Sequence, residues 1–495
     1  MIPRYSDPRI AEIFTDQAKL NGWQWVELSV VQARSNLGLI PSSTYFEMAN
    51  ILYNVSFDID FWLAEDKRIH HDLNAFIAER VRHLPPELAH EFHKDMTSYD
   101  TEDPAFARAL LDAASVIRLE LEDLTRLLGE MARQYRYVVM LRRTHGQWAK
   151  LGSFGGRVLT WIAMLNSAMS SLDSDIEQCK KSRISGAIGN YGGNMTPLIE
   201  ARALRLVGLE PFYGATQIMP RTVHARLAQT LQLIAEAIGK IALDIRLGAR
   251  SGKPLWHEPF SKVQKGSSAM PHKKNTINTE KICGMVNLVR GNVMSIVQSI
   301  QTWEERAIEQ SCVERVAWPD LFHTMAHMTT VLTKVLQGLV VYPDHMMQEI
   351  VESRGTYASD EAKNFLATEC ASRGVGSETA YRIIQLSSFC VFEPTPLGNW
   401  ARNESFTNHE QADEFLSSAL RPITNDGTIK NMIGRAQLFP VEGLAATVEN
   451  VDAWNALLRD IFSDEATQGR WEHLFKPSNL LKGEAFLFEQ ILDHS

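Results

Sequence analysis

Cysteine is scarce in this chain of 495 residues: five cysteines lie far apart, and no two of them form a CxxC pair. A disulfide framework or a zinc ribbon requires closely and regularly spaced cysteines, so the sequence argues against both. Isolated cysteines are typical of proteins that keep their thiols reduced. We therefore expect a cytoplasmic protein.

Long hydrophobic runs are missing as well. A membrane-spanning helix needs about 20 consecutive, mainly apolar residues. The most apolar helical segment, 158–169, is interrupted by Asn166 and Ser167. The first residues, MIPRYSDPRI, lack the apolar core of a secretory signal. We expect neither a transmembrane span nor a membrane partner.

The chain has no excess of positive charge. It contains 50 Lys and Arg against 59 Asp and Glu, which gives a formal net charge of −9. A general nucleic-acid binder normally presents a basic face, so no nucleic-acid partner is expected. An anionic small molecule remains compatible with this charge, because a few local cations are enough to build its site.

Two patterns that often bind nucleotides or metals are incomplete. The glycine-rich segment 186–193 fits neither GxGxxG after a strand nor GxxxxGK[ST]. His323 and His327 are spaced i,i+4 on an expected helix, but no glutamate completes HExxH. We interpret the two histidines as a core or interface pair and expect no metal site.

Helical periodicity dominates what is present. Apolar residues recur at spacings of three and four in the segments 223–247, 279–303 and 321–339, while alternating strand patterns are few and short. The fold class predicted is all-α, with a central bundle of long helices. Polar and proline-containing stretches near residues 100 and 350 predict a three-domain subunit, with domains at 1–103, 104–348 and 349–495.

The segment 265–275, KGSSAMPHKKN, combines features that suit a carboxylate or another anion. Gly266 permits close approach of the backbone, and Ser267 and Ser268 supply hydroxyl groups. Lys273 and Lys274 add positive charge, and the start of the following helix is expected to add more. From these properties alone, a flexible basic loop before a helix is an equal alternative.

This segment resembles the signature loop of the aspartase/fumarase superfamily, GSxxMPxKxN, at every fixed position. The resemblance implies an all-helical homotetramer whose active sites are assembled from three chains. It also implies anti elimination of fumarate by side-chain acid–base chemistry, without a metal or an organic cofactor.

Motifs elsewhere are most similar to those of the adenylosuccinate lyase family within this superfamily. They run from Arg4-Tyr5 near the start to the segment WEERAIEQSCVER at 303–315, and more weakly to GVGSETAYRIIQ at 374–385. The family splits adenylosuccinate into AMP and fumarate, and it also acts on the succinyl-aminoimidazole carboxamide ribotide. We therefore expect a nucleotide substrate.

The resemblance assigns catalytic roles to three residues. Ser267 is expected to be the base that removes a proton from carbon, and His145 the acid that protonates the leaving nitrogen. A serine can act as a base only where its alkoxide is stabilised and water is excluded, whereas histidine has a suitable pKa. His71 is expected to orient His145 or to contact the substrate.

The remaining motif residues are expected to bind substrate. Lys273 and Asn275 are assigned to a succinyl carboxylate, and Arg4, Arg306 and Arg315 to phosphate or carboxylate, for which arginine offers bidentate geometry. The other expected substrate-binding residues are Tyr5, His70, Asp72, His93, Thr97, Ser98, Thr144, Gln217, Glu280 and Ser311. A helix would not place Arg306, Ser311 and Arg315 on one narrow stripe, so we expect a bend or loop among them.

The chain departs from the family pattern at several positions, and two alternatives to the expected function stay open. The family's HAxPTTFG is WAKLGSFG here, with Trp148, Leu151, Gly152 and Ser153 at the changed positions. Asp95, Thr222, Thr276 and Lys281 also differ from the usual residues. One alternative is a related lyase or cycloisomerase acting on another N-succinyl, nitrosuccinyl or muconate-type acid. The other is a non-catalytic binding protein on the same scaffold.

Overall fold

The computed structural model describes residues 1–392 and 448–493, and the chain divides into two compact units, each made of three segments. The first unit comprises Met1–Leu127, Ala163–Leu247 and Glu258–Leu339. The second comprises Leu128–Ile162, Gly248–His257 and the described part of Val340–Ser495. The division of the subunit into three consecutive domains stays a prediction.

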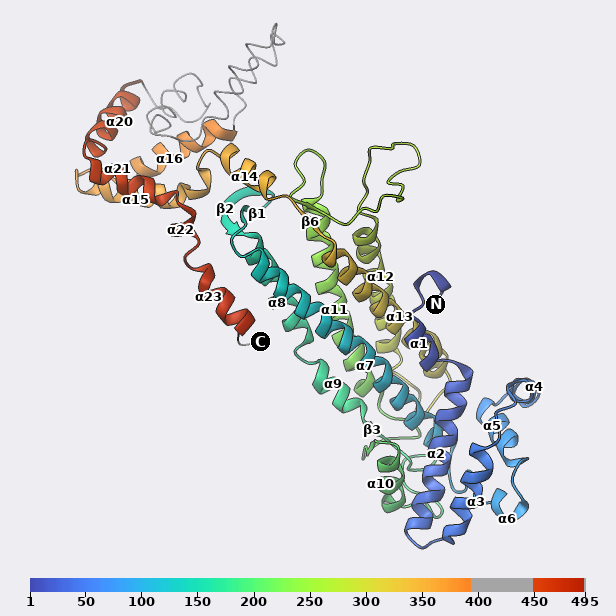
Figure 1. The fold of residues 1–495 in the computed structure, drawn as a ribbon. Helices are drawn as coiled ribbons and strands as arrows, with labels where there is room; N and C mark the ends of the chain where they lie inside the picture. The colour runs from blue at the N-terminus through green and yellow to red at the C-terminus, as the bar shows by residue number, and fades with distance from the viewer. Residues whose placement is uncertain (393–447, 494–495) are drawn as a thin grey trace. The chain divides into compact units, whose positions relative to one another are not determined.

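The first unit is built almost entirely from helices (Figure 1). It begins with η1 (Pro3–Tyr5), α1 (Pro8–Ile13), α2 (Asp16–Asn36), α3 (Ser42–Tyr53), α4 (Ile59–Ile69), α5 (Asp72–Val81) and α6 (Pro86–Ala89). It continues with most of α7 (Ser98–Gln134), the end of α8 (Phe154–Met169), α9 (Leu172–Cys179), α10 (Pro197–Leu206), α11 (Arg221–Gly248), α12 (Ile277–Gln298) and α13 (Glu309–Gln337). Two short parallel strands, β3 (Lys181–Ser182) and β4 (Glu210–Pro211), pair with each other.

The long helices form their core from apolar stripes with alternating spacings of four and three residues. In α11 the fully buried stripe is Leu227, Leu231, Ile234, Ile238, Ile241 and Ile245. In α12 it is Ile282, Val286, Val289, Val293 and Ile296, and in α13 it is Leu321, Met325, Met328, Leu332 and Val335. This spacing keeps one face of each helix toward its neighbours, and each buried side chain contributes about 1.5–3 kcal/mol to folding.

Close approach of α11 and α12 depends on a glycine. A Cβ atom on Gly239 would lie 2.7 Å from Cγ2 of Val286, so any larger residue would force the helices apart. Near the start of α11, Phe106 of α7 makes edge-to-face contacts with His224 and with Trp318 of α13. These contacts bring α7, α11 and α13 together.

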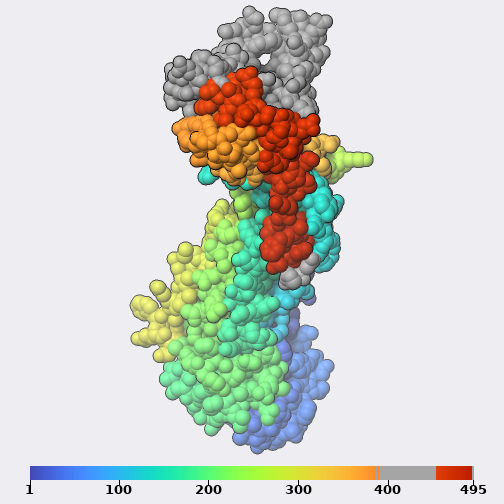
Figure 2. All heavy atoms as spheres, turned by 90° about the vertical axis from the view of Figure 1, so that its left-hand side faces the viewer, coloured from blue at the N-terminus to red at the C-terminus, as the bar shows by residue number. Residues whose placement is uncertain are grey.

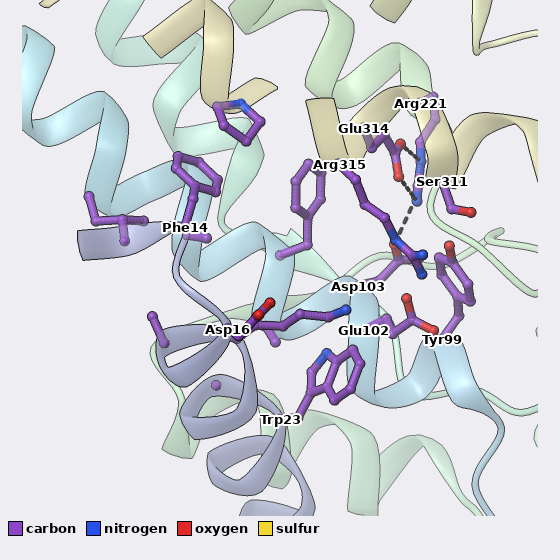
Figure 3. Close-up of a pocket in the computed structure, with 18 residues that line it drawn as sticks. Phe14, Asp16, Trp23, Tyr99, Glu102, Asp103, Arg221, Ser311, Glu314 and Arg315 are labelled. Carbon is purple, nitrogen blue, oxygen red and sulfur yellow. Dashed lines mark hydrogen bonds and ion pairs between the residues drawn. The ribbon is translucent and has the colours of Figure 1, made fainter. Parts of the chain in front are cut away.

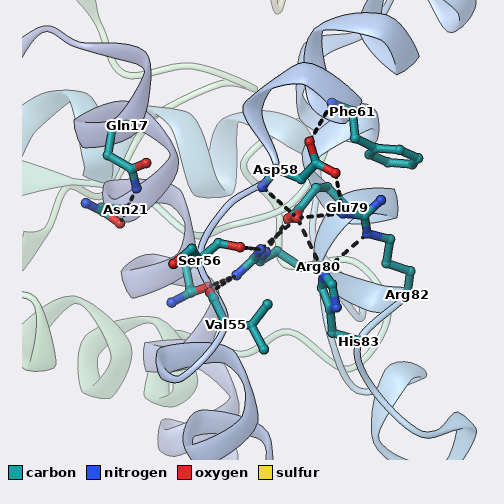
Figure 4. Close-up of polar contacts among 11 residues, drawn as sticks. Gln17, Asn21, Val55, Ser56, Asp58, Phe61, Glu79, Arg80, Arg82 and His83 are labelled. Atoms are coloured by element: carbon teal, nitrogen blue, oxygen red, sulfur yellow. Dashed lines mark hydrogen bonds and ion pairs between the residues drawn. The ribbon is translucent and has the colours of Figure 1, made fainter.

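A buried arginine anchors the loop between α3 and α4 (Figure 4). Arg80 is fully buried and donates to the carbonyl oxygens of Val55 and Ser56, both at about 3 Å, while its neighbour Glu79 balances its charge. Its guanidinium also lies 3.9 Å from the ring centroid of Phe57. A planar fork with five donors can hold two carbonyls and a carboxylate at once, which explains an arginine at this buried position.

The second unit contains the end of α7, the start of α8 and a set of helices from the C-terminal third. These helices are α14 (Pro343–Glu352), η2 (Thr356–Ala358), α15 (Ser359–Ala371), α16 (Ser377–Phe392), α20 (Val448–Ile461), α21 (Glu465–Leu474), α22 (Pro477–Leu480), α23 (Glu484–Phe488) and η3 (Glu489–Asp493). The short strands β5 (Trp256–His257) and β6 (Val340–Val341) pair antiparallel. Cys370, Ile383, Leu458 and Ile461 belong to its buried apolar core.

An antiparallel hairpin, β1 (Val139–Thr144) and β2 (Gln147–Ser153), is the longest sheet among the described residues. Val139 pairs with Ser153 and Thr144 with Gln147, and the register shifts between Leu141 and Arg143. Buried and exposed residues do not alternate regularly along these strands. The sequence therefore lacks the alternating pattern of a strand, and sequence reasoning did not predict them.

The all-α fold class predicted from periodicity is confirmed. The three helical segments named in the sequence correspond to α11, α12 and α13. However, α12 ends at Gln298, before Trp303, and α13 begins at Glu309, well before residue 321. Within the described residues, no helix has the length and apolarity needed to cross a membrane.

Candidate active site

The segment 265–275 forms a loop that closes on itself in the first unit. A Cβ atom on Gly266 would lie 1.9 Å from the carbonyl oxygen of Lys273, so only glycine fits there. The side-chain amide of Asn275 donates to the carbonyl oxygen of Gly266 at 2.9 Å. The fixed glycine and asparagine of the signature therefore hold the two ends of the loop together.

Ser267 occupies the turn inside this loop. Its Oγ accepts hydrogen bonds from the backbone N–H groups of Met270, at 3.1 Å, and Ala269, at 3.3 Å. Two amide donors aimed at one hydroxyl oxygen stabilise negative charge on that oxygen. The geometry is thus suited to an alkoxide at Ser267, as the predicted role requires.

The start of α12 was predicted to add positive charge to the loop, but a carboxylate occupies this end of the helix. The carboxylate of the buried Glu258 accepts the N–H groups of Asn278 and Thr279, at 3.2 and 3.4 Å. This residue therefore satisfies part of the helix end and offsets its positive potential. Lys265, Lys273 and Lys274 are exposed, and positive charge at the loop comes from these three side chains. The exposed Glu280 accepts from the hydroxyl of Thr276, at 3.3 Å.

Four predicted substrate-binding residues meet in the first unit, although they are far apart in the sequence. Nη1 of Arg306 donates to Oγ of Ser98 and to Oε1 of Gln217, both at 3.2 Å. Nε2 of Gln217 in turn donates to Oγ1 of Thr97, at 3.4 Å. The guanidinium of Arg306 also lies 4.1 Å from the ring centroid of Tyr99. We call Thr97, Ser98, Gln217 and Arg306 the amide cluster.

A pocket of about 290 Å³ lies next to Tyr99 in the same unit (Figure 3). The pocket is lined by Trp23 of α2, Glu102 of α7, and Ser311 and Arg315 of α13. Ser311 and Arg315 are four residues apart on α13, whereas Arg306 lies in the loop before this helix. The break expected between Arg306 and the other two residues is therefore present.

Asp72 joins two cations beside this pocket. Its carboxylate pairs with Nη2 of Arg315 at 2.7 Å and with Nζ of Lys19 at 3.0 Å. Lys19 also lies over the indole ring of Trp23, 4.4 Å from the centroid. Burial opposes ionisation of Asp72, but the two cations dominate and lower its pKa. At neutral pH the group is an ionised carboxylate between two cations that face the pocket.

Glu102 is an acidic group of this pocket whose pKa is strongly raised. Burial, followed by the nearby charge of Asp72, raises the pKa of Glu102 to about 7, against the opposing influence of Lys19, Arg315 and Arg306. Sequence reasoning missed both Lys19 and Glu102. Neither belongs to a motif, and only their burial beside Asp72 and Arg315 reveals them.

The three predicted histidines of the first unit have different environments. His70 ends α4 with a left-handed backbone, and His71 caps α5 by accepting the N–H of Asn74 at Nδ1, at 3.2 Å. Both are exposed, so each ring retains a face for a ligand. His93 instead contacts the buried Glu27 through Nδ1, at 2.8 Å. Burial favours the neutral ring, but the carboxylate dominates and raises the pKa of His93.

The N-terminal arm is fixed by the histidine pair of α13. Nδ1 of His323 accepts the N–H of Asp7 at 3.0 Å, and the ring of His327 packs edge-on against Tyr5, with 5.2 Å between centroids. These contacts agree with the prediction of a core or interface pair. They leave Arg4 exposed in η1, one residue before Tyr5.

His145 lies in the second unit, at the tip of the β1–β2 hairpin. It has φ of 52° and Gly146 has φ of 78°, which is the pattern of a two-residue turn with positive φ at both positions. His145 and Thr144 are exposed, and the hairpin is held by an ion pair between Arg143 and Glu349, at 2.5 Å. A rigid turn therefore presents the imidazole to solvent, where it can reach a ligand.

The changed positions after His145 have a structural role in this unit. Oγ of Ser153 donates to Oε2 of Glu484 at 2.7 Å, and the backbone N–H of Ser153 donates to Oε1 at 3.0 Å. A Cβ atom on Gly156 would lie 2.6 Å from the same carboxylate. The Ser153 hydroxyl is thus engaged by a side chain of α23.

Comparison with known proteins identifies relatives over most of the chain. A sequence model of the family described as "Lyase" matches residues 4–291. The adenylosuccinate lyase of Thermotoga maritima is 33% identical over 414 residues, covering 84% of this chain and 92% of the relative. That of Synechocystis is 36% identical, with 78% and 88% covered, and that of Bacillus subtilis is 31% identical, with 85% and 94% covered.

Solved structures share the fold at lower sequence identity. A fumarate lyase from Mesorhizobium superposes with a TM-score of 0.77 at 19% identity, covering 100% of both chains. A 3-carboxy-cis,cis-muconate lactonizing enzyme from Pseudomonas putida gives 0.74 at 18% identity, covering 99% of this chain and 97% of that one. With its signature loop, its helical fold and relatives that include proteins 33% and 36% identical, the chain belongs to the adenylosuccinate lyase family of the aspartase/fumarase superfamily.

Proposed function

We propose that this protein eliminates fumarate from adenylosuccinate, giving AMP, and acts on succinyl-aminoimidazole carboxamide ribotide in the same way. The observation that carries the proposal is the signature loop, in which two backbone N–H groups converge on Oγ of Ser267. Curated relatives named adenylosuccinate lyase, at 31–36% identity, support the choice of substrate.

In the proposed reaction, the Ser267 alkoxide takes a proton from the succinyl carbon beside a carboxylate. The electron pair of that C–H bond forms the double bond of fumarate, and the C–N bond breaks. His145 delivers a proton to the departing nitrogen, so that AMP leaves as a neutral amine. Exposure of the imidazole on a rigid turn supports this role.

Cations and amides of the first unit suit the anionic groups of the substrate. The amide cluster and the pocket beside it contain Arg306, Ser311 and Arg315, and the signature loop contributes Lys273 and Asn275. Arginine binds phosphate and carboxylate through two parallel hydrogen bonds. The proposed set of substrate-contacting residues also includes Arg4, Tyr5, His70, His71, His93, Thr144 and Glu280.

We further propose a cytoplasmic homotetramer with active sites shared between chains. Large apolar side chains remain exposed on α11 and α12, among them Leu233, Leu243, Leu288 and Met294. Figure 2 shows that green residues, from the part of the chain that contains α11, form much of the exposed surface of the first unit on one side. Such apolar positions on long helices support burial against further copies.

The decisive experiment is fumarate release from adenylosuccinate by the purified protein. Ser267→Ala and His145→Ala are each expected to lower kcat by roughly 100-fold or more, because each removes a proton-transfer group. Ser261→Ala and His473→Ala are matched controls on an exposed serine near the loop and an exposed histidine of α21, and both should retain turnover. A folded wild type that releases no fumarate would contradict the proposed substrate.

A further inference from the structure

Arg183, directly after β3, is a fully buried arginine that no predicted motif includes. Its guanidinium donates to the backbone carbonyl oxygens of Gln217 and Gly186, and its Nε donates to Oγ of Ser185 at 3.1 Å. Each nitrogen of the Arg183 guanidinium therefore has an acceptor. One of the acceptors is the backbone of a residue in the amide cluster.

Asp100 is the counterion of Arg183 and is also fully buried. The two charges lie 2.7 Å apart, between Nη2 and Oδ1. Oδ2 of Asp100 accepts the N–H of Thr97 at 2.8 Å, and Oδ1 accepts the N–H of Gly186 at 3.1 Å. The buried pair thus holds the backbones of Gln217 and Thr97, whose side chains touch each other in the amide cluster.

The glycine-rich segment 186–193 is shaped by the same contacts. Gly189 has φ of 76°, and a Cβ atom there would lie 2.0 Å from the carbonyl oxygen of Ala215. The segment must therefore lie directly against residues 215–217. Tyr191 and the N–H of Ile184 are held by the carboxylate of Glu200, at 2.5 and 2.8 Å. This network explains a glycine-rich segment that fits no phosphate-binding pattern.

We propose that Arg183, with Asp100 as its counterion, is a positioning residue that orients the Gln217 amide toward the substrate. The inference rests on the proposed function, in which Gln217 contacts the nucleotide. Arg183 holds the Gln217 backbone, Asp100 holds the Thr97 backbone, and the ion pair fixes the distance between them. A lysine keeps the charge but cannot supply the fork that reaches two carbonyls and a carboxylate at once.

Kinetics of fumarate release from adenylosuccinate test this role. Arg183→Lys is expected to raise KM about tenfold with kcat changed less than about twofold, because a charged hydrogen bond that orients a binding group is lost. In a Gln217→Ala background the same change should raise KM no further. Arg80→Lys is the matched control: this buried arginine also binds two carbonyls, and its replacement should lower Tm without changing KM.

An equal rise in KM with and without Gln217, or an equal rise in Arg80→Lys, would overturn the proposal.

Amide hydrogen exchange provides a readout that needs no substrate. Arg183→Lys, and Asp100→Asn as a second variant, should speed exchange at residues 215–219, and Arg80→Lys should not. Unchanged exchange there also overturns the proposal. An inactive wild type would contradict the proposed function alone, because exchange still decides whether Arg183 positions this segment.

Discussion

At the scale of single residues, the pocket beside Tyr99 changes the chemistry of the groups that line it. Glu102 shares this space with Arg315, and Asp72 and Lys19 act on it from α5 and α2. In water its carboxyl would be ionised well below neutral pH. Burial removes the solvation of the charge, and the neighbouring carboxylate opposes it, so the proton stays bound until about pH 7.

Glu102→Gln is expected to stabilise the protein at high pH. Because the pKa of Glu102 is about 7 in the folded state and near 4.5 in the unfolded state, the folded state holds this proton more tightly. Stability is therefore lost as pH rises from about 4.5 to 7, by about 3 kcal/mol in all. Thermal unfolding of both forms should show a higher Tm for the variant at pH 8 and similar values at pH 4.5. An equal difference at both pH values would contradict this account.

At the scale of elements, a buried triad joins three helices. Arg221 begins α11 and pairs with Asp103 in α7, at 2.8 Å, and with Glu314 in α13, at 2.5 Å. Its side chain is only 3% exposed. The two carboxylates share one guanidinium as their cation, so this residue links the three helices.

Arg221→Met is expected to destabilise the protein by about 3–5 kcal/mol, because two buried carboxylates lose their partner. Chemical denaturation measures the change. Arg290→Met is a matched control: it removes an arginine that pairs with a glutamate between α12 and α11, but that pair is exposed, and little change in midpoint is expected. A similar loss in both variants would show that burial is not the cause.

In the second unit, the carboxylate of Glu484 links the C-terminal segment to Ser153. Glu484→Ala leaves the N–H and the hydroxyl of the fully buried Ser153 without this acceptor. We expect a loss of about 1–3 kcal/mol from the docking of α23. Limited proteolysis should then cut more rapidly around residues 477–488. Glu489→Ala, which removes an exposed carboxylate five residues further along, should not have this effect. An unchanged rate of proteolysis in Glu484→Ala would contradict the role given to this carboxylate.

At the scale of the whole molecule, the proposed tetramer requires the exposed apolar faces of α11 and α12. Leu233 is 58% exposed and Leu288 is 50% exposed. Side chains of this size on long helices gain free energy when a second copy covers them. Shared active sites would make activity depend on this assembly.

Leu233→Lys combined with Leu288→Lys is expected to dissociate the tetramer and to lower fumarate release about tenfold or more, since charges are costly in an apolar interface. Light scattering after size exclusion measures the assembly. Leu39→Lys, on an exposed leucine of the loop between α2 and α3, should leave it unchanged. A wild type that is monomeric and fully active would contradict the proposed sharing of sites.

Motif residues that lie close together in the sequence could be assigned without a structure. The signature loop is one such case, because its glycine and asparagine are only nine residues apart and contact each other. The need for a bend or loop among Arg306, Ser311 and Arg315 also followed from helical spacing. The β1–β2 hairpin could not be predicted in this way. Its two-residue turn uses His145 and Gly146, and a histidine with positive φ is uncommon.

By itself, the sequence determined the helical fold class, the stripes that form the core, the signature loop and the family. These depend on periodicity and on contacts between near neighbours. The tertiary structure decided that Asp72 meets Arg315, that Gln217 meets Thr97 and Arg306, and that Arg183 lies behind them. It also decided the pKa of Glu102. Such contacts join residues up to 243 positions apart, and desolvation depends on everything that surrounds a group, so neither can be read from local sequence.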